Sequence, residues 1–381
     1  MIRRLLVLGA VGVALAGGAR FALGELAGRR WETRKAELRA LALFPSGVRR
    51  PWELRFEALV ARLSTSERFS EIVESPYRSY IAWGSGEQRP LDDFEKIWLE
   101  SLWNELAGLD SLLAEVRALP LEELAWGGGP TKLMTLREIT NALCGRAWLA
   151  VEAGDGAAAA QAYGDALRLA LATDDGSSIG AMIHVASDGI VLRAVRSALA
   201  FGAPPRTLRA VIEPLLAGWE DVPDRAERAI RRDLALGAAT AEDEPDSPVE
   251  ALRQFAGVEA ALALARGPAE ELVRARDDRA ASEQSLQVAW TSVPLCLHGM
   301  HAQRNVALTA LAVAELRQER GTFPASLAEV ETLPRKHAID PLTDELLPYS
   351  LTDSGARIGP AAWAAHDAPV PEDSLYAWTL R

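Results

Sequence analysis

Cysteine is scarce in this chain. Cys144 and Cys296 are the only two among 381 residues, so at most one intramolecular disulfide can form. Basic residues are also in the minority, because 41 Lys and Arg stand against 53 Asp and Glu and give a formal net charge of −12. That balance argues against nucleic acid as a partner, since binding to a phosphate backbone needs positive charge. With 29 glycines and 21 prolines, the chain is not of the disordered type.

Complete catalytic motifs are missing as well. Residues 176–180 match the pattern G-x-S-x-G with Ser178 at its centre, but a nucleophile elbow needs a strand before the serine, and a helix is predicted there. The glycine-rich run 127–132 lacks the G-x-x-x-x-G-K-[ST] spacing of a phosphate loop, and no apolar strand leads into it. We interpret the first as a connection between two helices and the second as a flexible loop.

One cluster of metal-binding residue types remains, formed by Cys296, His298 and His301. Histidines three residues apart share a helix face, and with the thiol they could supply three ligands. No carboxylate lies at metal-ligand spacing nearby, and Pro294 indicates the start of a helix rather than the middle of a rigid one. We predict no metal and no cofactor, and these three residues are the candidates should a metal site exist.

The chain begins with a short basic segment, Met1–Arg4, which is followed by fifteen residues without a charge, Leu5–Ala19. Fifteen residues are short for a membrane-spanning helix, which needs about 20. The run fits the apolar region of a secretory signal, with an A-x-A cleavage site at 14–16. Alternatively, Arg20 snorkels and the span continues as an uncleaved anchor. We predict a signal peptide or membrane anchor over residues 1–26.

Charge is unevenly distributed along the chain. Residues 1–50 hold ten Lys and Arg against three Glu, whereas the remainder is acidic. A basic start suits an anionic membrane surface, so we predict the membrane as a partner of the N-terminal segment, with protein partners besides. We expect the body outside the cytoplasm, anchored in the inner membrane or released as a periplasmic or secreted protein. The basic residues at 29–35 favour the opposite orientation by the positive-inside rule, so the orientation stays open.

Apolar residues recur at helical spacing over most of the chain, which predicts a mostly α-helical fold built as a multi-helix bundle. Helices at 135–153 and 157–173, joined by a tight glycine turn, are similar to one tetratricopeptide hairpin, without a second copy at that period. Short strands at 347–351, 357–359 and 375–380, with a hairpin turn at 352–355, predict a small antiparallel C-terminal sheet. The predicted divisions are the signal or anchor 1–26, a helical domain 27–239, an acidic linker or loop 240–248, a helical continuation 249–320 and a small α+β cap 321–381.

The stretch 302–349 carries the most specific local pattern. A helix ends on basic residues and Gly321, and after it come Phe323–Pro324, a capping box from Ser326 to Glu329, a D-P-x-T turn and a tyrosine-bearing strand. This order resembles the region after the long helix in major pseudopilins of type II secretion. It also resembles the C-terminal end of uncharacterised membrane-anchored helical proteins of bacteria. The resemblance implies the local fold of this region.

The N-terminal motif of the pilins is not matched. Residues 21–26 resemble its hexamer, yet Arg20 occupies the place of the cleavage glycine, and the apolar run precedes the hexamer instead of following it. We therefore take the local fold from the resemblance and not the pilus function.

Three functional hypotheses fit these features. The first is a non-catalytic structural or interaction protein of the cell envelope, associated with a secretion or assembly system. The second is a hydrolase or metal-dependent enzyme built on Ser178 or on the cluster at 296–301. The third is a tetratricopeptide-like adaptor that binds peptides, which requires a groove formed by at least three stacked hairpins. Convergence of the candidate side chains with a carboxylate in a cleft would favour the enzyme.

Overall fold

The structure is a computed structural model, and most of the helical body and the C-terminal sheet can be described. The described residues are 33, 51–74, 89–121, 124, 130–172, 176–217, 222–240, 263, 266, 285–341, 343–353, 355–359 and 378–380. The predicted signal or anchor at 1–26, residues 241–248 of the acidic linker and the glycine-rich run at 127–129 lie outside them.

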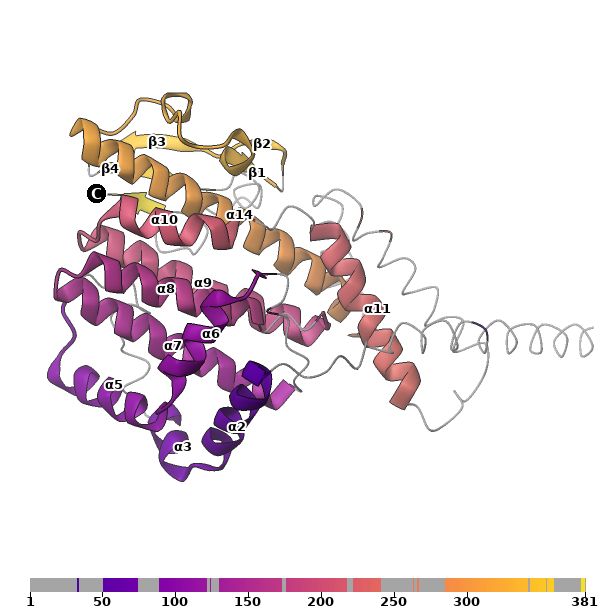
Figure 1. The fold of residues 1–381 in the computed structure, drawn as a ribbon. Coiled ribbons are helices and arrows are strands. Elements are labelled where there is room, and N and C mark those ends of the chain that lie inside the picture. Colours follow the sequence, from indigo (N-terminus) through magenta and orange to yellow (C-terminus); the bar gives the residue numbers. More distant parts are fainter. Residues whose placement is uncertain are drawn as a thin grey trace, which may run out of the picture.

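The prediction of a mostly helical protein with a small C-terminal antiparallel sheet is confirmed (Figure 1). The described helices are α2 (Pro51–Thr65), α3 (Glu67–Glu74), α5 (Asp93–Glu105), α6 (Leu109–Ala118), α7 (Pro130–Glu152), α8 (Gly156–Ala172), α9 (Ser178–Ala200), α10 (Pro205–Leu216), α11 (Val222–Thr240) and α14 (Ser285–Arg320). Two 3-10 helices, η3 (Leu327–Glu329) and η4 (Arg335–Ala338), lead into strands β1 (Ile339–Asp340), β2 (Glu345–Leu346), β3 (Tyr349–Thr352), β4 (Gly355–Ile358) and β5 (Trp378–Leu380).

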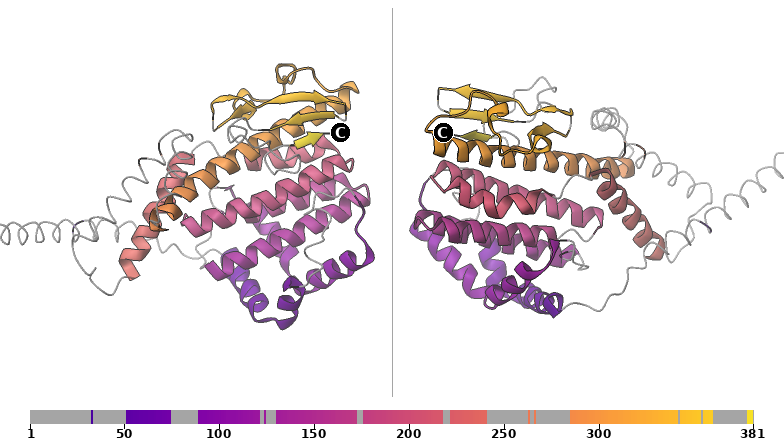
Figure 2. Two further views of the ribbon diagram at one scale, coloured as in Figure 1. Left: turned by 180° about the vertical axis from the view of Figure 1, so that it is seen from behind. Right: turned by 45° about the horizontal axis from the view of Figure 1, so that its top comes forward.

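The body is a stack of helices in two rows. Helix α7 packs on α9, and α9 packs on α14, so these three lie side by side when the molecule is seen from behind (Figure 2). Helices α8 and α10 pack on each other and form the second row, with α8 against α7 and α9, and α10 against α14. Helices α2, α3 and α5 lie at one end of the stack, α6 packs on α2 and α8, and α14 carries the sheet at the other end (Figure 1).

The predicted turn between α7 and α8 is present at Gly154–Gly156. Gly154 has a φ of +74°, the left-handed conformation that ends a helix without a Cβ penalty. Asp155 then begins the next helix, because its Oδ1 accepts the backbone N–H of Ala158 at 2.9 Å. These local signals explain why the sequence located this helical pair correctly.

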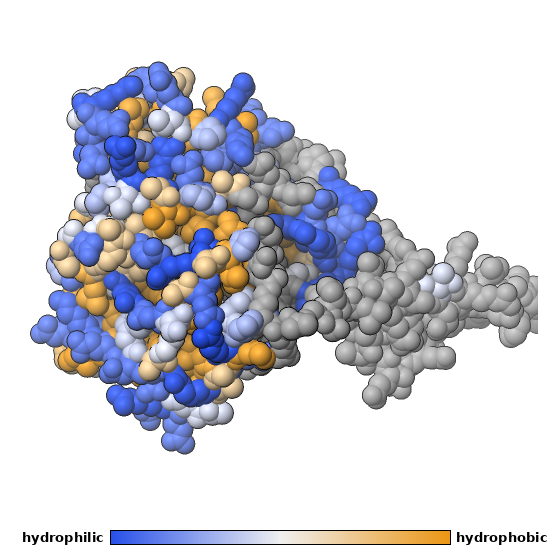
Figure 3. Space-filling view, in the orientation of Figure 1, coloured by the Kyte–Doolittle hydropathy of each residue, from blue (hydrophilic) through white to orange (hydrophobic). Residues whose placement is uncertain are grey.

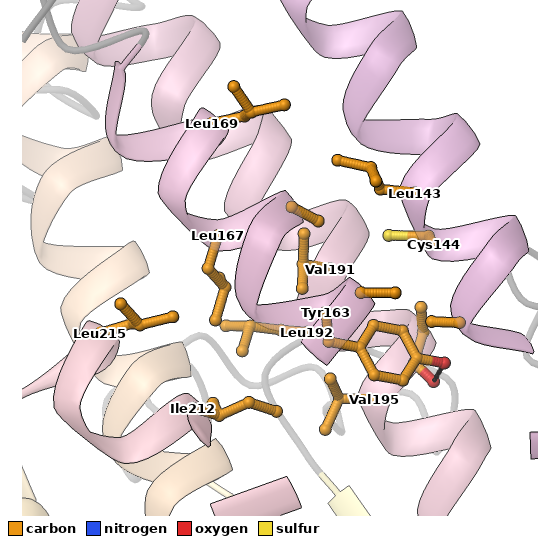
Figure 4. Close-up of a cluster of buried hydrophobic side chains, with 14 of the residues drawn as sticks. Leu143, Cys144, Tyr163, Leu167, Leu169, Val191, Leu192, Val195, Ile212 and Leu215 are labelled. Atoms are coloured by element: carbon orange, nitrogen blue, oxygen red, sulfur yellow. Dashed lines mark hydrogen bonds between the residues drawn. The ribbon is translucent and has the colours of Figure 1, made fainter. Parts of the chain in front are cut away.

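The core lies between the two rows and continues along the whole stack. Leu143 and Cys144 of α7, Tyr163 and Leu167 of α8, and Val191 and Val195 of α9 converge in it (Figure 4). The Tyr163 hydroxyl, although buried, donates to the carbonyl of Ala194 at 3.3 Å. Small residues on α8 let its neighbours come close, since a Cβ built on Gly164 would lie 2.6 Å from Cγ1 of Val211 in α10.

We expect Gly164→Ala to destabilise the protein by about 1–3 kcal/mol, because the added methyl group forces α8 away from α10. Gly189→Ala in α9 is the matched control. Its Cβ would meet only the Gln303 side chain, at 3.9 Å, so better helix propensity makes this change neutral or slightly stabilising. Urea unfolding followed by circular dichroism measures both. Equal effects of the two substitutions would contradict the close α8–α10 contact.

The C-terminal region matches part of its predicted pattern. Strands β3 and β4 form a hairpin with Thr352 opposite Gly355, as predicted, and β5 pairs with β4 on its other side. The turn after Asp340 is also present, since the N–H groups of Thr343 and Asp344 both donate to the Asp340 carbonyl. Ile358 and Trp378, which are buried, lie opposite each other and belong to the hydrophobic core.

Two local predictions in this region are wrong. Pro294 does not begin a helix but lies inside α14, which runs over 36 residues and is held by packing against helices that include α9 and α10. The predicted capping box at Ser326 does not form, since that side chain makes no capping hydrogen bond and the Glu329 carboxylate accepts the N–H of Ala325 instead. A single 3-10 turn, η3, follows.

Candidate functional site

The candidate metal residues are not brought together. Cys296 and His301 are half-buried on α14 and His298 is buried. Cys296 and His298 are two residues apart on a helix, which places them on nearly opposite faces. Among the described residues, no three His, Cys, Asp or Glu side chains form a group that could hold a metal ion.

Neither cysteine has the properties of a nucleophile. Both are free thiols, so the disulfide that two cysteines would permit is not formed. Burial raises the pKa of the Cys144 thiol far above its usual range, and burial also raises the pKa of Cys296. Reactive cysteines have a lowered pKa, whereas these two stay protonated at neutral pH.

Ser178 lies at the start of α9, after a helix rather than a strand, so its interpretation as part of a helix connection is confirmed. Ser177 is the N-cap and accepts the N–H of Gly180 at 2.9 Å. The backbone N–H of Ser178 donates to Asp233 Oδ1 of α11 at 3.1 Å. The Ser178 hydroxyl is buried and has no hydrogen-bond partner among the described residues, so no base activates it.

A buried polar cluster lies where α9 packs on α14. It consists of His184, Asp188 and Arg304, whose side chains are 0%, 0% and 1% exposed. Arg304 donates from Nε to Asp188 Oδ2 at 2.8 Å and from Nη2 to the same oxygen. Nη2 also lies 3.3 Å from Nε2 of His184. The same Nε2 lies 3.6 Å from Oδ2 of Asp188, so the three side chains contact one another.

This cluster resembles a catalytic site in its residue types, but a substrate cannot reach its side chains. A general base or nucleophile must come within hydrogen-bond reach of a substrate, and none of these three side chains is exposed. Their bonds instead join residues 116 and 120 positions apart in the chain and fix α9 against α14. The geometry therefore supports a structural role: the cluster holds two helices of the stack in register.

The cluster also explains the character of α9. Within the described part of the chain, α9 is the helix that is long and apolar enough to cross a membrane, but 61% of its apolar window is buried in the body. Two of its four ionisable residues, His184 and Asp188, are the groups that Arg304 contacts. Helix α9 is thus the central core helix of the stack, packed between α7 and α14.

A second polar junction ties the helical stack to the segment before the sheet. Arg209 of α10, 8% exposed, donates to Glu213 Oε2 and Glu315 Oε2, both at 2.9 Å. It also donates to the hydroxyl of Thr332 at 2.8 Å and to its carbonyl at 2.5 Å. One guanidinium thus joins α10, α14 and the loop after η3, which sets the position of the C-terminal cap.

One groove opens on the surface of the described part of the chain. An open groove of about 350 Å³ lies where the ends of α9 and α14 meet, and Arg317 is the one ionisable residue in its lining. That guanidinium stacks over the Phe323 ring, 4.4 Å from its centroid. Polar and apolar side chains are interspersed on the face in Figure 3. The exposed large apolar residues among those described are Leu54, Phe94, Ile97, Ile179, Met182, Leu346 and Leu351.

Comparisons of the chain with protein-family models, with curated proteins and with solved structures each found no match.

Proposed function

We propose that this protein is a non-catalytic structural or interaction protein of the cell envelope, held at the membrane or exported by residues 1–26. The observation that carries the proposal is the burial of His184, Asp188 and Arg304. Because these three side chains join α9 to α14 and none is exposed, they support a structural role for the body over a catalytic one. The basic and then apolar start of the sequence supplies the link to the membrane.

Two finer statements belong to the same proposal. The first is an association with a secretion or assembly system, which rests on the predicted anchor and the helical body. A tetratricopeptide-like adaptor is the second candidate function, and the packing of the helices favours it. Helices α7, α9 and α14 form one row and α8 and α10 the other, which is the alternation expected of stacked hairpins. An adaptor of this kind would bind a peptide across the row α7–α9–α14.

Cell fractionation of a bacterium expressing the full chain with a C-terminal tag tests the proposal. We expect the protein in the membrane or periplasmic fraction, and a variant lacking residues 1–26 in the cytoplasm. The double substitution Val11→Arg and Val13→Arg should also leave the protein in the cytoplasm. Each charge in the apolar run costs about 2.5–3.5 kcal/mol in membrane insertion. The matched control is Leu54→Arg, which adds an equal charge at an exposed position of α2.

The mass of the protein recovered from the wild-type strain distinguishes a cleaved signal peptide from an uncleaved membrane anchor. Cleavage after Ala16 indicates a signal peptide, whereas the full mass indicates an anchor. Protease added to intact spheroplasts then reports the side of the membrane, through cleavage in the acidic segment 240–248. Recovery of the uncleaved wild-type chain in the soluble cytoplasmic fraction would overturn the proposed function.

A further inference from the structure

Helix α5 presents a pair of large apolar side chains to the surface. Phe94 is 65% exposed and Ile97 is 60% exposed, the two highest values among the large apolar residues of the described chain. Residues three apart are neighbours on one side of a helix, so the two side chains form one patch. The core side of α5 is already filled by Trp98, Leu99 and Leu102. Single exposed apolar residues are ordinary, whereas an adjacent pair of this size indicates a contact surface.

Carboxylates border this apolar pair. Asp93 lies four residues before Ile97 and Glu100 three residues after it, and both are exposed, so helix geometry places them beside the patch. Helix α5 carries one Asp and three Glu against one Lys, and α3, which packs on α5, carries three Glu against one Arg (Figure 1). We call Asp93, Phe94, Ile97 and Glu100 the α5 face.

The basic side chains of these two helices lie close to carboxylates. Lys96 Nζ is 3.8 Å from Glu152 Oε2, and Arg68 Nε is 3.6 Å from Glu105 Oε1. Their charges are therefore offset locally, and acidic residues remain in excess on α3 and α5. The α5 face is thus an apolar patch in acidic surroundings.

This charge decides between three occupants of the face. A symmetric contact with a second copy of the chain would place the carboxylates of the α5 face against themselves. An anionic lipid surface would be repelled by the same carboxylates. A protein segment that combines apolar with basic side chains is complementary to the face in both respects.

We propose that the α5 face docks a basic amphipathic helix of a partner protein. The apolar stripe of that helix covers Phe94 and Ile97, and its Lys or Arg side chains meet Asp93 and Glu100. An amphipathic helix has apolar side chains at a spacing of three and four residues with charged ones beside them, which is the pattern that an exposed helix face can receive. The inference rests on the proposed role as an interaction protein and names the kind of partner.

A synthetic amphipathic helix of leucine and lysine is the probe. The full chain, captured through a C-terminal tag in a neutral detergent, is titrated with the labelled peptide, and a surface with detergent alone supplies the reference. We expect saturable binding that weakens as the salt concentration rises, because the charges are screened. The same peptide with glutamate in place of lysine should bind about tenfold more weakly or less tightly still.

Two double variants separate the apolar from the charged contribution. Phe94→Ser with Ile97→Ser should lower the affinity for the lysine peptide by about tenfold or more, since apolar anchors dominate such contacts. This variant keeps every charge, so its loss distinguishes docking from general attraction to an acidic protein. Asp93→Asn with Glu100→Gln should lower the affinity by about threefold and reduce its salt dependence.

Leu351→Ser is the matched control, because Leu351 is 52% exposed on β3, at the end of the stack that carries the sheet. It should leave the affinity unchanged. The proposal is overturned if the double serine variant binds the lysine peptide as tightly as the wild type, or if the lysine and glutamate peptides bind equally. It is also overturned if sedimentation shows wild-type dimers that the double serine variant dissociates, since a second copy then occupies the face. Binding to the purified chain is independent of cell fractionation, so a failure here leaves the envelope assignment standing.

Discussion

Replacing Asp188 by alanine will lower the free energy of unfolding by about 3–5 kcal/mol, the loss typical when one member of a buried ion pair is removed. Arg304 is 1% exposed, and it donates from both Nε and Nη2 to Asp188 Oδ2. Without that oxygen the guanidinium charge stays between α9 and α14 with the ring of His184 beside it. Urea unfolding followed by circular dichroism, extrapolated to water, measures the loss.

The double substitution Asp188→Leu with Arg304→Met shows whether the loss arises from the uncompensated charge. Apolar residues of similar volume in place of a buried ion pair are often neutral or stabilising, so we expect the double variant to recover most of the stability. The exposed pair Arg55–Glu115 supplies the control, with side chains 53% and 37% exposed. Glu115→Ala should cost no more than about 1 kcal/mol. A cost of that small size for Asp188→Ala would refute the structural role of the cluster.

Local signals in the sequence were enough to predict much of the fold. The turn at Gly154–Gly156 and the hairpin between Thr352 and Gly355 were found because glycine and short polar residues determine backbone conformation over a few residues. Pro294 was misinterpreted because its effect on the helix depends on tertiary packing rather than on local sequence. A proline usually ends or begins a helix, but the packing of α14 against α9 and α10 outweighs this preference, and the helix continues through it.

The candidate site was harder to predict than the fold. The sequence pointed to Cys296, His298 and His301, which share a short segment but do not converge. Part of the buried cluster left a signal, since His184 and Asp188 stand four residues apart within an apolar helix, where a buried polar group needs a hydrogen-bond partner. The partner, Arg304, is 116 residues from Asp188. Only the packing of α9 on α14 identifies it, and that packing depends on the whole stack.

His298 is expected to make the stability of the protein fall between neutral and acidic pH. Its side chain is 8% exposed, and neither ring nitrogen has a hydrogen-bond partner among the described residues. Burial lowers its pKa from the usual 6.5 to about 4. The unfolded chain therefore binds a proton between these two values and the folded chain does not. The contribution of the neutral, buried His298 to the free energy of unfolding is fully present above pH 6.5 and is lost as the pH falls toward 4.

At about pH 4.5 the loss from this one residue should amount to about 2–3 kcal/mol, since each unit of pKa difference contributes about 1.4 kcal/mol. Carboxylates also titrate in this range, so the wild type must be compared with His298→Leu, which keeps them all. At pH 7 the two proteins should differ by less than about 1.5 kcal/mol, because the substitution exchanges one buried neutral side chain for another of similar size. On acidification the leucine variant should become the more stable, and parallel unfolding curves for both proteins from pH 7 to about pH 4.5 would exclude a neutral, buried His298.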